Sequence, residues 1–369
     1  MKLLNNIFAT LIILTLLNCN VFAKDNQQYP NISGNALFEA RVDRADSANT
    51  SDVKSINGLI NIDADFSLNI NKNWSVITDW RIKQVKGKNP NDNNPERYRT
   101  ILFNRGLNVE DEGLVVEQLK GQFENDDARF FFGKFNPAFG SAFRKEKRIG
   151  IFTTDFTKDY ELREKIGAGF TALLQDSEIE FSLFSNDKTT LNESAIQKRD
   201  NLNNSDDLAG DKSSYSVAIK GKDLFAVNNL TYNFGYRNLA VRNIAGRSDE
   251  VGIVGGLEYL LPIRSEISFI PFIEISHINN LSGEKNRDAL YSTVAIVSKY
   301  KSWTASISSI GRDIKQQNNI SSNKDSQIQY SLGYKFDNNI ILDATRARIK
   351  ENGYNANLTG VNLSYSYNF

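Results

Sequence analysis

Charged side chains crowd the segment 136–163. The basic residues are Arg144, Lys145, Lys147, Arg148 and Lys158, and the acidic ones are Glu146, Asp155, Asp159 and Glu161. Fixed charges of both signs select between anions and cations when they face each other across a narrow, water-filled passage. In open solvent the same charges form an ordinary surface loop. The chemistry that this segment suggests is therefore ion selection, provided that the rest of the chain encloses it.

Residues suited to catalysis are scarce. His277 is the one histidine and lies beside Ser276, whereas acid–base and nucleophilic chemistry normally uses a histidine next to a nucleophile or a pair of carboxylates. A lone histidine is more often structural, and no GxSxG, HExxH or phosphate-binding loop pattern occurs. We therefore predict no enzymatic activity, no cofactor and no metal ion. The 44 basic and 44 acidic residues balance, which gives no sign of a nucleic-acid partner.

The N-terminus has the order of a secretory signal. Lys2 precedes a mainly apolar run over 7–17, and Val21-Phe22-Ala23 ends with a small residue at the expected cleavage point. The apolar run is too short for a membrane-spanning helix. We expect a signal peptide over 1–23 and one mature domain over 24–369. The alternative is a lipoprotein modified at Cys19, although Asn18 before it fits that pattern poorly.

The end of the chain alternates strictly between apolar and polar residues. Val361, Leu363, Tyr365, Tyr367 and Phe369 take every second position, so one face of a strand is apolar and the other polar. The same alternation recurs along the chain and predicts sixteen antiparallel strands. They are expected at about 32–44, 55–70, 73–85, 113–123, 128–135, 164–175, 178–186, 212–221, 224–238, 249–261, 266–279, 287–299, 300–311, 326–336, 339–350 and 358–369. The fold class predicted is all-β: a transmembrane up-and-down β-barrel.

The connections between these strands alternate between short and long. Short links are expected at 71–72, 124–127, 176–177, 222–223, 262–265, 299/300 and 337–338. Longer polar ones are expected at 45–54, 86–112, 136–163, 187–211, 239–248, 280–286, 312–325 and 351–357. This asymmetry is typical of barrels that cross an outer membrane, with the short side periplasmic. The pattern leaves two uncertain places: 97–108 could be a further strand, and Pro271 within a strand suggests a bulge.

Strand alternation also predicts which charges face the inside of the barrel. If apolar positions such as Trp74 and Trp80 face lipid, the polar positions between them face the lumen. The lumen wall predicted in this way comprises Arg41, Asp63, Asp65, Asp79 and Arg81, together with Glu39. Arg346 and Arg348 break the rule, because they share their face with Ile340 and Leu342. Either a bulge shifts the alternation there, or the two arginines lie above the membrane.

Two local motifs, GKFNPAFG over 133–140 and DYELREKIG over 159–167, resemble Gram-negative outer-membrane porins, in particular alphaproteobacterial ones. The resemblance extends to the exported N-terminus and the terminal Phe. It implies that the third long loop, 136–163, folds into the lumen and narrows it, with Arg144, Lys145, Lys147, Arg148, Asp155, Asp159 and Glu161 at the constriction. It further implies an assembly signal at Tyr365, Tyr367 and Phe369.

The function that follows is a water-filled channel for passive diffusion of ions and small hydrophilic solutes. The expected partners are outer-membrane lipid and lipopolysaccharide, the barrel-assembly machinery, the solutes themselves and further copies of the chain in a homotrimer. The alternative is a non-conducting barrel that acts as an adhesin or a scaffold.

Overall fold

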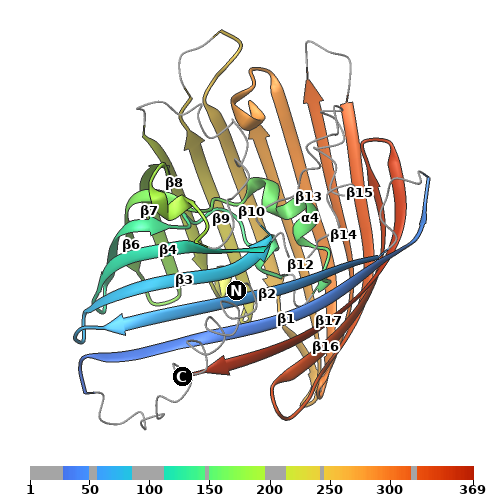
Figure 1. Ribbon diagram of the computed structural model, residues 1–369, viewed down its shortest axis with the longest axis horizontal. Helices are drawn as coiled ribbons and strands as arrows, with labels where there is room; N and C mark the ends of the chain where they lie inside the picture. The colour runs from blue at the N-terminus through green and yellow to red at the C-terminus, as the bar shows by residue number, and fades with distance from the viewer. Residues whose placement is uncertain are drawn as a thin grey trace, which may run out of the picture.

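The computed structural model describes residues 28–49, 56–84, 112–145, 149–195, 213–241, 245–316 and 322–369. They form one sheet of seventeen strand segments closed into a barrel (Figure 1). The segments are β1 (Asn31–Ala48), β2 (Ile56–Asn69), β3 (Trp74–Gln84), β4 (Glu112–Glu124), β5 (Ala128–Phe135), β6 (Lys165–Leu173), β7 (Ser177–Asn186), β8 (Ser214–Gly221), β9 (Leu230–Leu239), β10 (Glu250–Tyr259), β11 (Leu261–Arg264), β12 (Ile267–Asn279), β13 (Arg287–Tyr300), β14 (Trp303–Gln316), β15 (Ser322–Lys335), β16 (Ile340–Glu351) and β17 (Tyr354–Asn368).

Two of these segments are parts of one crossing. β10 and β11 both pair with β12, and only Leu260 separates them. Every neighbouring pair is antiparallel, so the described strands make sixteen antiparallel crossings, as the alternation predicted. Pro271 explains the interruption, because it lies in β12 opposite the break and has no N–H to donate across it. The pairing of β12 with β13 passes through Pro271 without a shift, so no bulge forms on that side.

The first and last strands close the barrel. β1 pairs with β17 from Asn35 opposite Asn368 to Ala48 opposite Ala356. At the end of the seam, the N–H of Gly34 donates to the carbonyl of Phe369 (2.9 Å), and the N–H of Phe369 donates back to Gly34 (3.1 Å). Closure leaves no unpaired sheet edge, which is the condition for a sheet surrounded by lipid.

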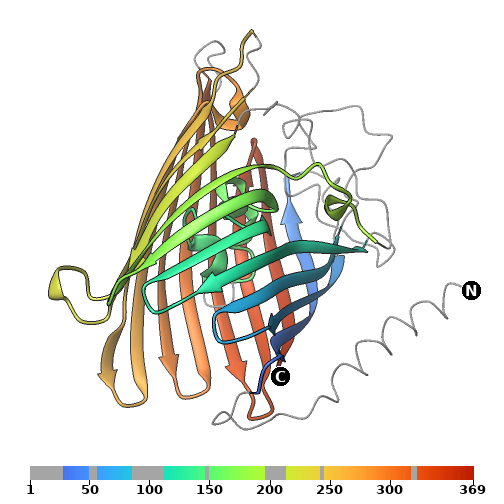
Figure 2. The ribbon, with the colours of Figure 1, turned by 90° about the vertical axis from the view of Figure 1, so that its left-hand side faces the viewer.

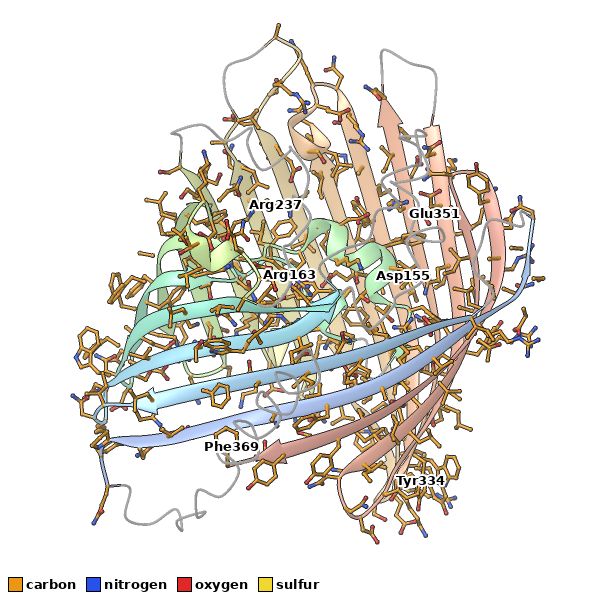
Figure 3. The ribbon with its side chains drawn as sticks, viewed as in Figure 1. Asp155, Arg163, Arg237, Tyr334, Glu351 and Phe369 are labelled. Carbon is orange, nitrogen blue, oxygen red and sulfur yellow. The ribbon has the colours of Figure 1, made fainter. Side chains whose placement is uncertain are left out.

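Apolar side chains cover the outer face of the barrel. Along β13, Leu290, Val294 and Ile296 are exposed, while Ala295 and Val297 at the alternate positions are buried. Aromatic rings gather at the end that carries the tight turns: Trp74 packs on Phe123 (5.2 Å between ring centroids), Trp303 on Tyr334 (4.8 Å) and Phe66 on Phe369 (5.6 Å). Figure 3 shows Tyr334 and Phe369 near this edge. Within the described residues, no helix has the length and apolar character needed to cross a membrane.

The connections follow the predicted asymmetry with four differences. The C-terminus and the tight turns other than Asn352-Gly353 lie at one end of the barrel (Figure 2). The link predicted at 222–223 extends to residue 229, and the connection predicted at 351–357 is a two-residue turn at Asn352-Gly353. Residues 262–264 belong to β11, and strands β14 and β15 take up most of 312–325. The uncertain stretch 97–108 lies outside the described residues.

Candidate functional site

The connection between β5 and β6 carries a row of apolar side chains that contact the barrel wall. It contains three short helical turns, η3 (Ala142–Lys145), α4 (Thr154–Thr157) and η4 (Lys158–Tyr160). Figures 1 and 2 both show α4 within the ring of strands. The described part of this connection, 136–145 and 149–164, is hereafter the inner segment.

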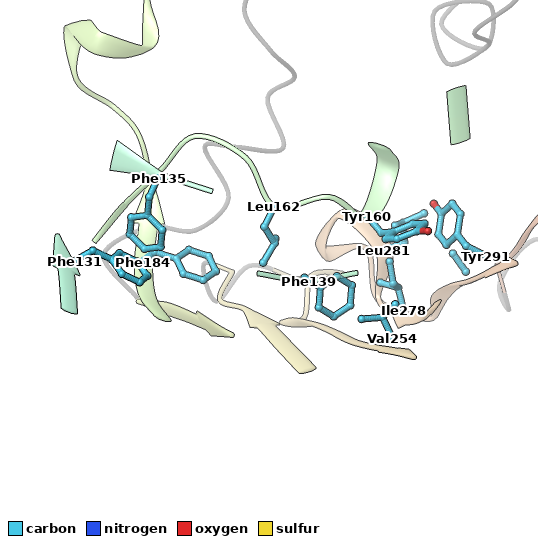
Figure 4. Packing of buried hydrophobic residues seen from close by; sticks show 11 residues of the cluster. Phe131, Phe135, Phe139, Tyr160, Leu162, Phe184, Val254, Ile278, Leu281 and Tyr291 are labelled. Carbon is cyan, nitrogen blue, oxygen red and sulfur yellow. The ribbon is translucent and has the colours of Figure 1, made fainter. Parts of the chain in front are cut away.

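Three clusters of buried side chains fix the inner segment to the wall. Phe139, Tyr160 and Leu162 pack with residues of β5, β7, β10, β12 and β13, as Figure 4 shows. Ile151, Phe152 and Phe156 pack against β14, β16 and β17. Ala142 and Ile149 pack against Ile270 and Phe272 of β12 and against β13. These wall residues are apolar although they face the interior, because they meet the inner segment there instead of water.

The carboxylate of Glu274 is the main polar anchor of the inner segment. Glu274 lies on β12 and is almost fully buried. It accepts hydrogen bonds from the backbone N–H of Ser141 (2.7 Å) and Ala142 (3.0 Å), from the Ser141 hydroxyl (2.8 Å) and from the Tyr160 hydroxyl (2.8 Å). Asn233 of β9 donates a further bond at 3.1 Å. Burial raises the pKa of the Tyr160 phenol well above its usual value, and the Glu274 charge raises it further, so Tyr160 remains a donor.

Two buried arginines bind the inner segment at residues 159 and 160. Arg312 of β14 pairs with Asp325 of β15 (2.6 Å) and Glu351 of β16 (2.9 Å) and reaches Asp159 at 2.8 Å. Arg237 of β9 pairs with Glu250 and donates to the carbonyl of Tyr160 at 2.5 Å.

Polar wall side chains complete this attachment. Gln327 and Gln329 of β15 bond to the carbonyl of Phe152 and the hydroxyl of Thr153, and Ser308 of β14 donates to the carbonyl of Ile149. Gly150 allows the close approach to Gln329, since its φ is +123° and a Cβ there would collide with that side chain.

A cavity of about 910 Å³ lies between the inner segment and strands β1–β4 and β7–β10. Acidic side chains on β1–β3 line it: Glu39, Asp63, Asp65 and Asp79. Basic side chains of the inner segment line it as well: Arg144, Lys145 and Arg163. The four carboxylates of β1–β3 are hereafter the acidic wall, and the three cations of the inner segment are the basic border. Arg81, Lys120 and Lys220 of the strands and Glu161 of the inner segment also line the cavity.

Ion pairs connect the acidic wall to its surroundings. Arg81 lies 3.3 Å from Asp63 and 3.1 Å from Glu117, which is fully buried on β4. Lys83 also pairs with Glu117, and it lies 3.2 Å from Glu164. At the bulge between β3 and β4, Glu117 is the extra residue and turns into the interior. The network holds the β3 charges in fixed positions.

Two of the three cavity-lining cations of the inner segment are also in ion pairs. Lys145 pairs with Glu258 at 2.6 Å, and Arg163 pairs with Glu161. Burial raises the pKa of Glu161, while Arg163 opposes that shift. Arg144 is exposed to the cavity and has no ion pair within the described residues; its guanidinium lies 5.2 Å from the ring centroid of Phe143.

The predicted site residues fall into three groups. Arg144, Lys145 and Glu161 of the inner segment line the cavity with Asp63, Asp65, Asp79 and Arg81 of the wall. Arg41, Asp155 and Asp159 do not line it: Arg41 donates to the carbonyl of Ile151 at 2.8 Å, Asp155 is buried in α4, and Asp159 meets Arg312. Figure 3 shows Asp155 and Arg163 in the central part of the barrel. Lys147 and Arg148 lie outside the described residues.

Sequence reasoning missed the residues that anchor the inner segment, namely Glu274, Arg312 and Arg237, and it missed Glu117, which pairs with Arg81 and Lys83 of β3. Glu274 was hard to find because it shares its face with the apolar Ile270 and Phe272. The sequence does indicate that this connection is anchored, because it holds more large apolar residues than a solvated loop would. These residues are Phe139, Phe143, Ile149, Ile151, Phe152, Phe156, Tyr160 and Leu162.

Comparison with known proteins shows the same architecture. No protein-family model matches the chain, and no curated protein matches its sequence. Among solved structures, OmpF of Salmonella typhi in a complex with daunomycin is similar with a TM-score of 0.60 and 11% identity, over 92% of this chain and 98% of that one. A loop L8 deletion mutant of OmpT, an outer membrane protein of Vibrio cholerae, has a TM-score of 0.53 and 9% identity over 92% and 100%.

The outer membrane protein OpdK of Pseudomonas aeruginosa is also similar, with a TM-score of 0.53 and 8% identity over 92% of this chain and 99% of that one. At these identities the likeness establishes the fold, a closed antiparallel barrel, over nearly the whole length of each chain.

Proposed function

We propose that this protein is a Gram-negative outer-membrane porin, a water-filled channel through which ions and small hydrophilic solutes diffuse passively. The observation that carries the proposal is the charge-lined cavity between the inner segment and the wall of a closed barrel whose outer face is apolar. Lipid contacts explain the apolar exterior, and permeating water and ions explain the charged interior. The fold shared with outer membrane proteins supports this location.

In this proposal, the inner segment folds into the lumen and narrows it. Its apolar row, its bonds to Glu274 and its pairs with the two buried arginines hold it against β9–β17. The passage then runs on the opposite side, between Arg144, Lys145 and Arg163 and the acidic residues of β1–β3. The N-terminal residues 1–23 serve as a cleaved signal peptide, and the barrel domain occupies 24–369.

Planar-bilayer recordings of purified full-length barrel test the proposal. We expect stepwise conductance that scales with salt concentration. A correctly folded barrel that never conducts would contradict the channel function and would favour the alternative, an adhesin or a scaffold.

Single cysteines should reveal the orientation in intact cells. The one native cysteine, Cys19, falls within the proposed signal peptide, so the mature chain has no background thiol. Two variants, Glu193→Cys and Lys285→Cys, place the cysteine in a long connection. Two others, Gln175→Cys and Asn338→Cys, place it in a short turn, and all four positions are exposed. We expect an impermeant maleimide to label the first pair only. Labelling confined to the second pair would reverse the proposed orientation.

Deleting Phe369 should reduce the yield of assembled barrel. The deletion removes both backbone bonds to Gly34 and the ring contacts with Phe66 and Tyr367, and it removes the aromatic end that we propose as the assembly signal with Tyr365 and Tyr367. Heat-modifiable barrel in outer-membrane fractions is the measurement. Phe369→Leu is the matched control, because it keeps the two backbone hydrogen bonds with Gly34. A normal yield of barrel after the deletion would argue against the proposed assembly signal.

A further inference from the structure

The outer face of β16 changes from apolar to cationic along its length. Leu342 and Ala344 are exposed near the tight-turn end, and Arg346, Arg348 and Lys350 follow at alternate positions, all exposed. No register shift interrupts the pairing of β16 with β15 or β17. A bulge therefore does not turn the two arginines inward, and the first of the two explanations considered from the sequence is wrong. The three cations are hereafter the β16 basic row.

The neighbouring strands do not neutralise this row. The residues opposite it are Ser326, Ile328 and Tyr330 on β15 and Asn355, Asn357 and Thr359 on β17. None is acidic, and none of the three cations makes an ion pair with another residue that the structure describes. Successive members are about 7 Å apart along the strand, so their charges repel.

Two other cations on the outer face of the barrel have acidic neighbours. Lys315 of β14 lies opposite Asp288 of β13, and Lys324 of β15 lies opposite Asp313 of β14. No carboxylate lies directly opposite the β16 basic row. Asp46 of β1 accepts a hydrogen bond from Thr359 (2.6 Å), and its ion pair is with Arg44 at 3.5 Å.

The row lies at the depth where lipid headgroups are expected. A transmembrane strand crosses the hydrocarbon in about 9–11 residues. Counted from Ile340, the first residue of β16, that length ends near Arg348 and Lys350. The flexible side chain of Arg346 can extend toward the same level. A cation on the lipid face is far less unfavourable at the interface than at the bilayer centre.

We propose that the β16 basic row binds the phosphate groups of lipid headgroups in the outer leaflet. Guanidinium groups bind phosphate through paired, charge-assisted hydrogen bonds, and an ammonium group adds a third positive charge. The apolar residues Leu342, Ala344 and Leu332 lie below the row and contact the acyl chains of the same lipid. This inference rests on the proposed membrane location and not on conduction.

The test compares two variants of the full barrel in neutral detergent. R346Q/R348Q/K350Q removes the row, and K315Q/K324Q removes two outer-face cations that have acidic neighbours. The probe is diphosphorylated lipid A, with the dephosphorylated lipid as a reference, and native mass spectrometry measures binding. We expect the first variant to lose about tenfold or more in affinity for the phosphorylated lipid, because each cation near an anionic surface contributes to binding. The second variant should change little, and R346K/R348K should retain binding.

Three results would overturn the proposal. The first is equal affinity of parent and R346Q/R348Q/K350Q for the phosphorylated lipid. The second is displacement of the lipid by millimolar inorganic phosphate, which would identify free phosphate as the ligand. The third is loss of self-association in this variant without loss of lipid binding, which would identify the row as a contact between copies. Conductance is measured separately, so a non-conducting barrel that binds the lipid would contradict the channel function alone.

Discussion

Glu274→Ala is expected to give a channel with higher conductance and larger current fluctuations than the parent. The substitution removes the acceptor for four hydrogen bonds from the inner segment. A hydrogen bond to a charged group contributes about 1.5–3 kcal/mol, so the loss weakens the attachment of residues 141–160 by several kcal/mol. The clusters around Phe139 and Phe152 remain, and the segment should become mobile without leaving the barrel.

Two controls separate this effect from a change in charge. Glu266→Ala removes a carboxylate from the exposed turn between β11 and β12, where it meets only Lys301 among the described residues. It should leave conductance and noise at the parental level. Glu274→Gln keeps the shape and one carbonyl acceptor, so an intermediate phenotype is expected. If Glu274→Ala conducts like the parent while the barrel remains folded, Glu274 does not hold the constriction.

The number of crossings was predictable because alternation is a local property of each strand. A period of two appears wherever one face meets lipid and the other meets a polar interior, and no tertiary information is needed to detect it. The confirmed count of sixteen follows from that. Pro271 conflicted with its strand assignment, and the conflict is resolved by a break in the neighbouring segment, which no property of β12 alone could reveal.

The errors in the connections have separate causes. Leu224, Phe225 and Val227 extend the apolar pattern before β9, but Asp223 and Phe225 adopt left-handed backbone angles and Phe225 is 88% exposed. The apolar residues of this turn therefore give the sequence pattern of a strand although they do not form one. The turn at Asn352-Gly353 was visible in the sequence, since Asn-Gly with two positive φ angles is the usual two-residue hairpin turn.

The site was only partly accessible to sequence reasoning. Alternation placed Asp63, Asp65, Asp79 and Arg81 on one face, and these four line the cavity. It could not indicate that Asp159 would meet Arg312, because that pair joins residues 153 positions apart. Contacts of this range depend on how the inner segment folds against the wall, and they decide which charges remain available to a permeating ion.

Neutralising Arg144 and Lys145 together should shift the reversal potential in a salt gradient toward cation preference. Both residues line the cavity, and loss of Lys145 also removes its ion pair with Glu258. A unit charge about 8 Å away at an effective dielectric constant near 40 contributes on the order of 1 kcal/mol, so the permeability ratio should change roughly two- to fivefold.

The reverse change should follow from the acidic wall. In D63N/D65N, two of the carboxylates opposite the basic border lose their charge, so the reversal potential should move toward anion preference by a similar amount. Both shifts should shrink as salt concentration rises, because mobile ions screen the fixed charges. The distinctive result is that the reversal potential shifts in opposite directions in the two variants, since general damage to the barrel would shift it in the same direction in both.

The matched control is K188Q/K285Q, which removes two positive charges from exposed positions in long connections outside the cavity. Ions in bulk solvent screen these charges within about 10 Å at 0.1 M salt, so the reversal potential should stay near the parental value. If R144Q/K145Q shifts the potential no more than K188Q/K285Q does, the inner segment does not border the conducting path. In that case the ion preference arises elsewhere along the barrel.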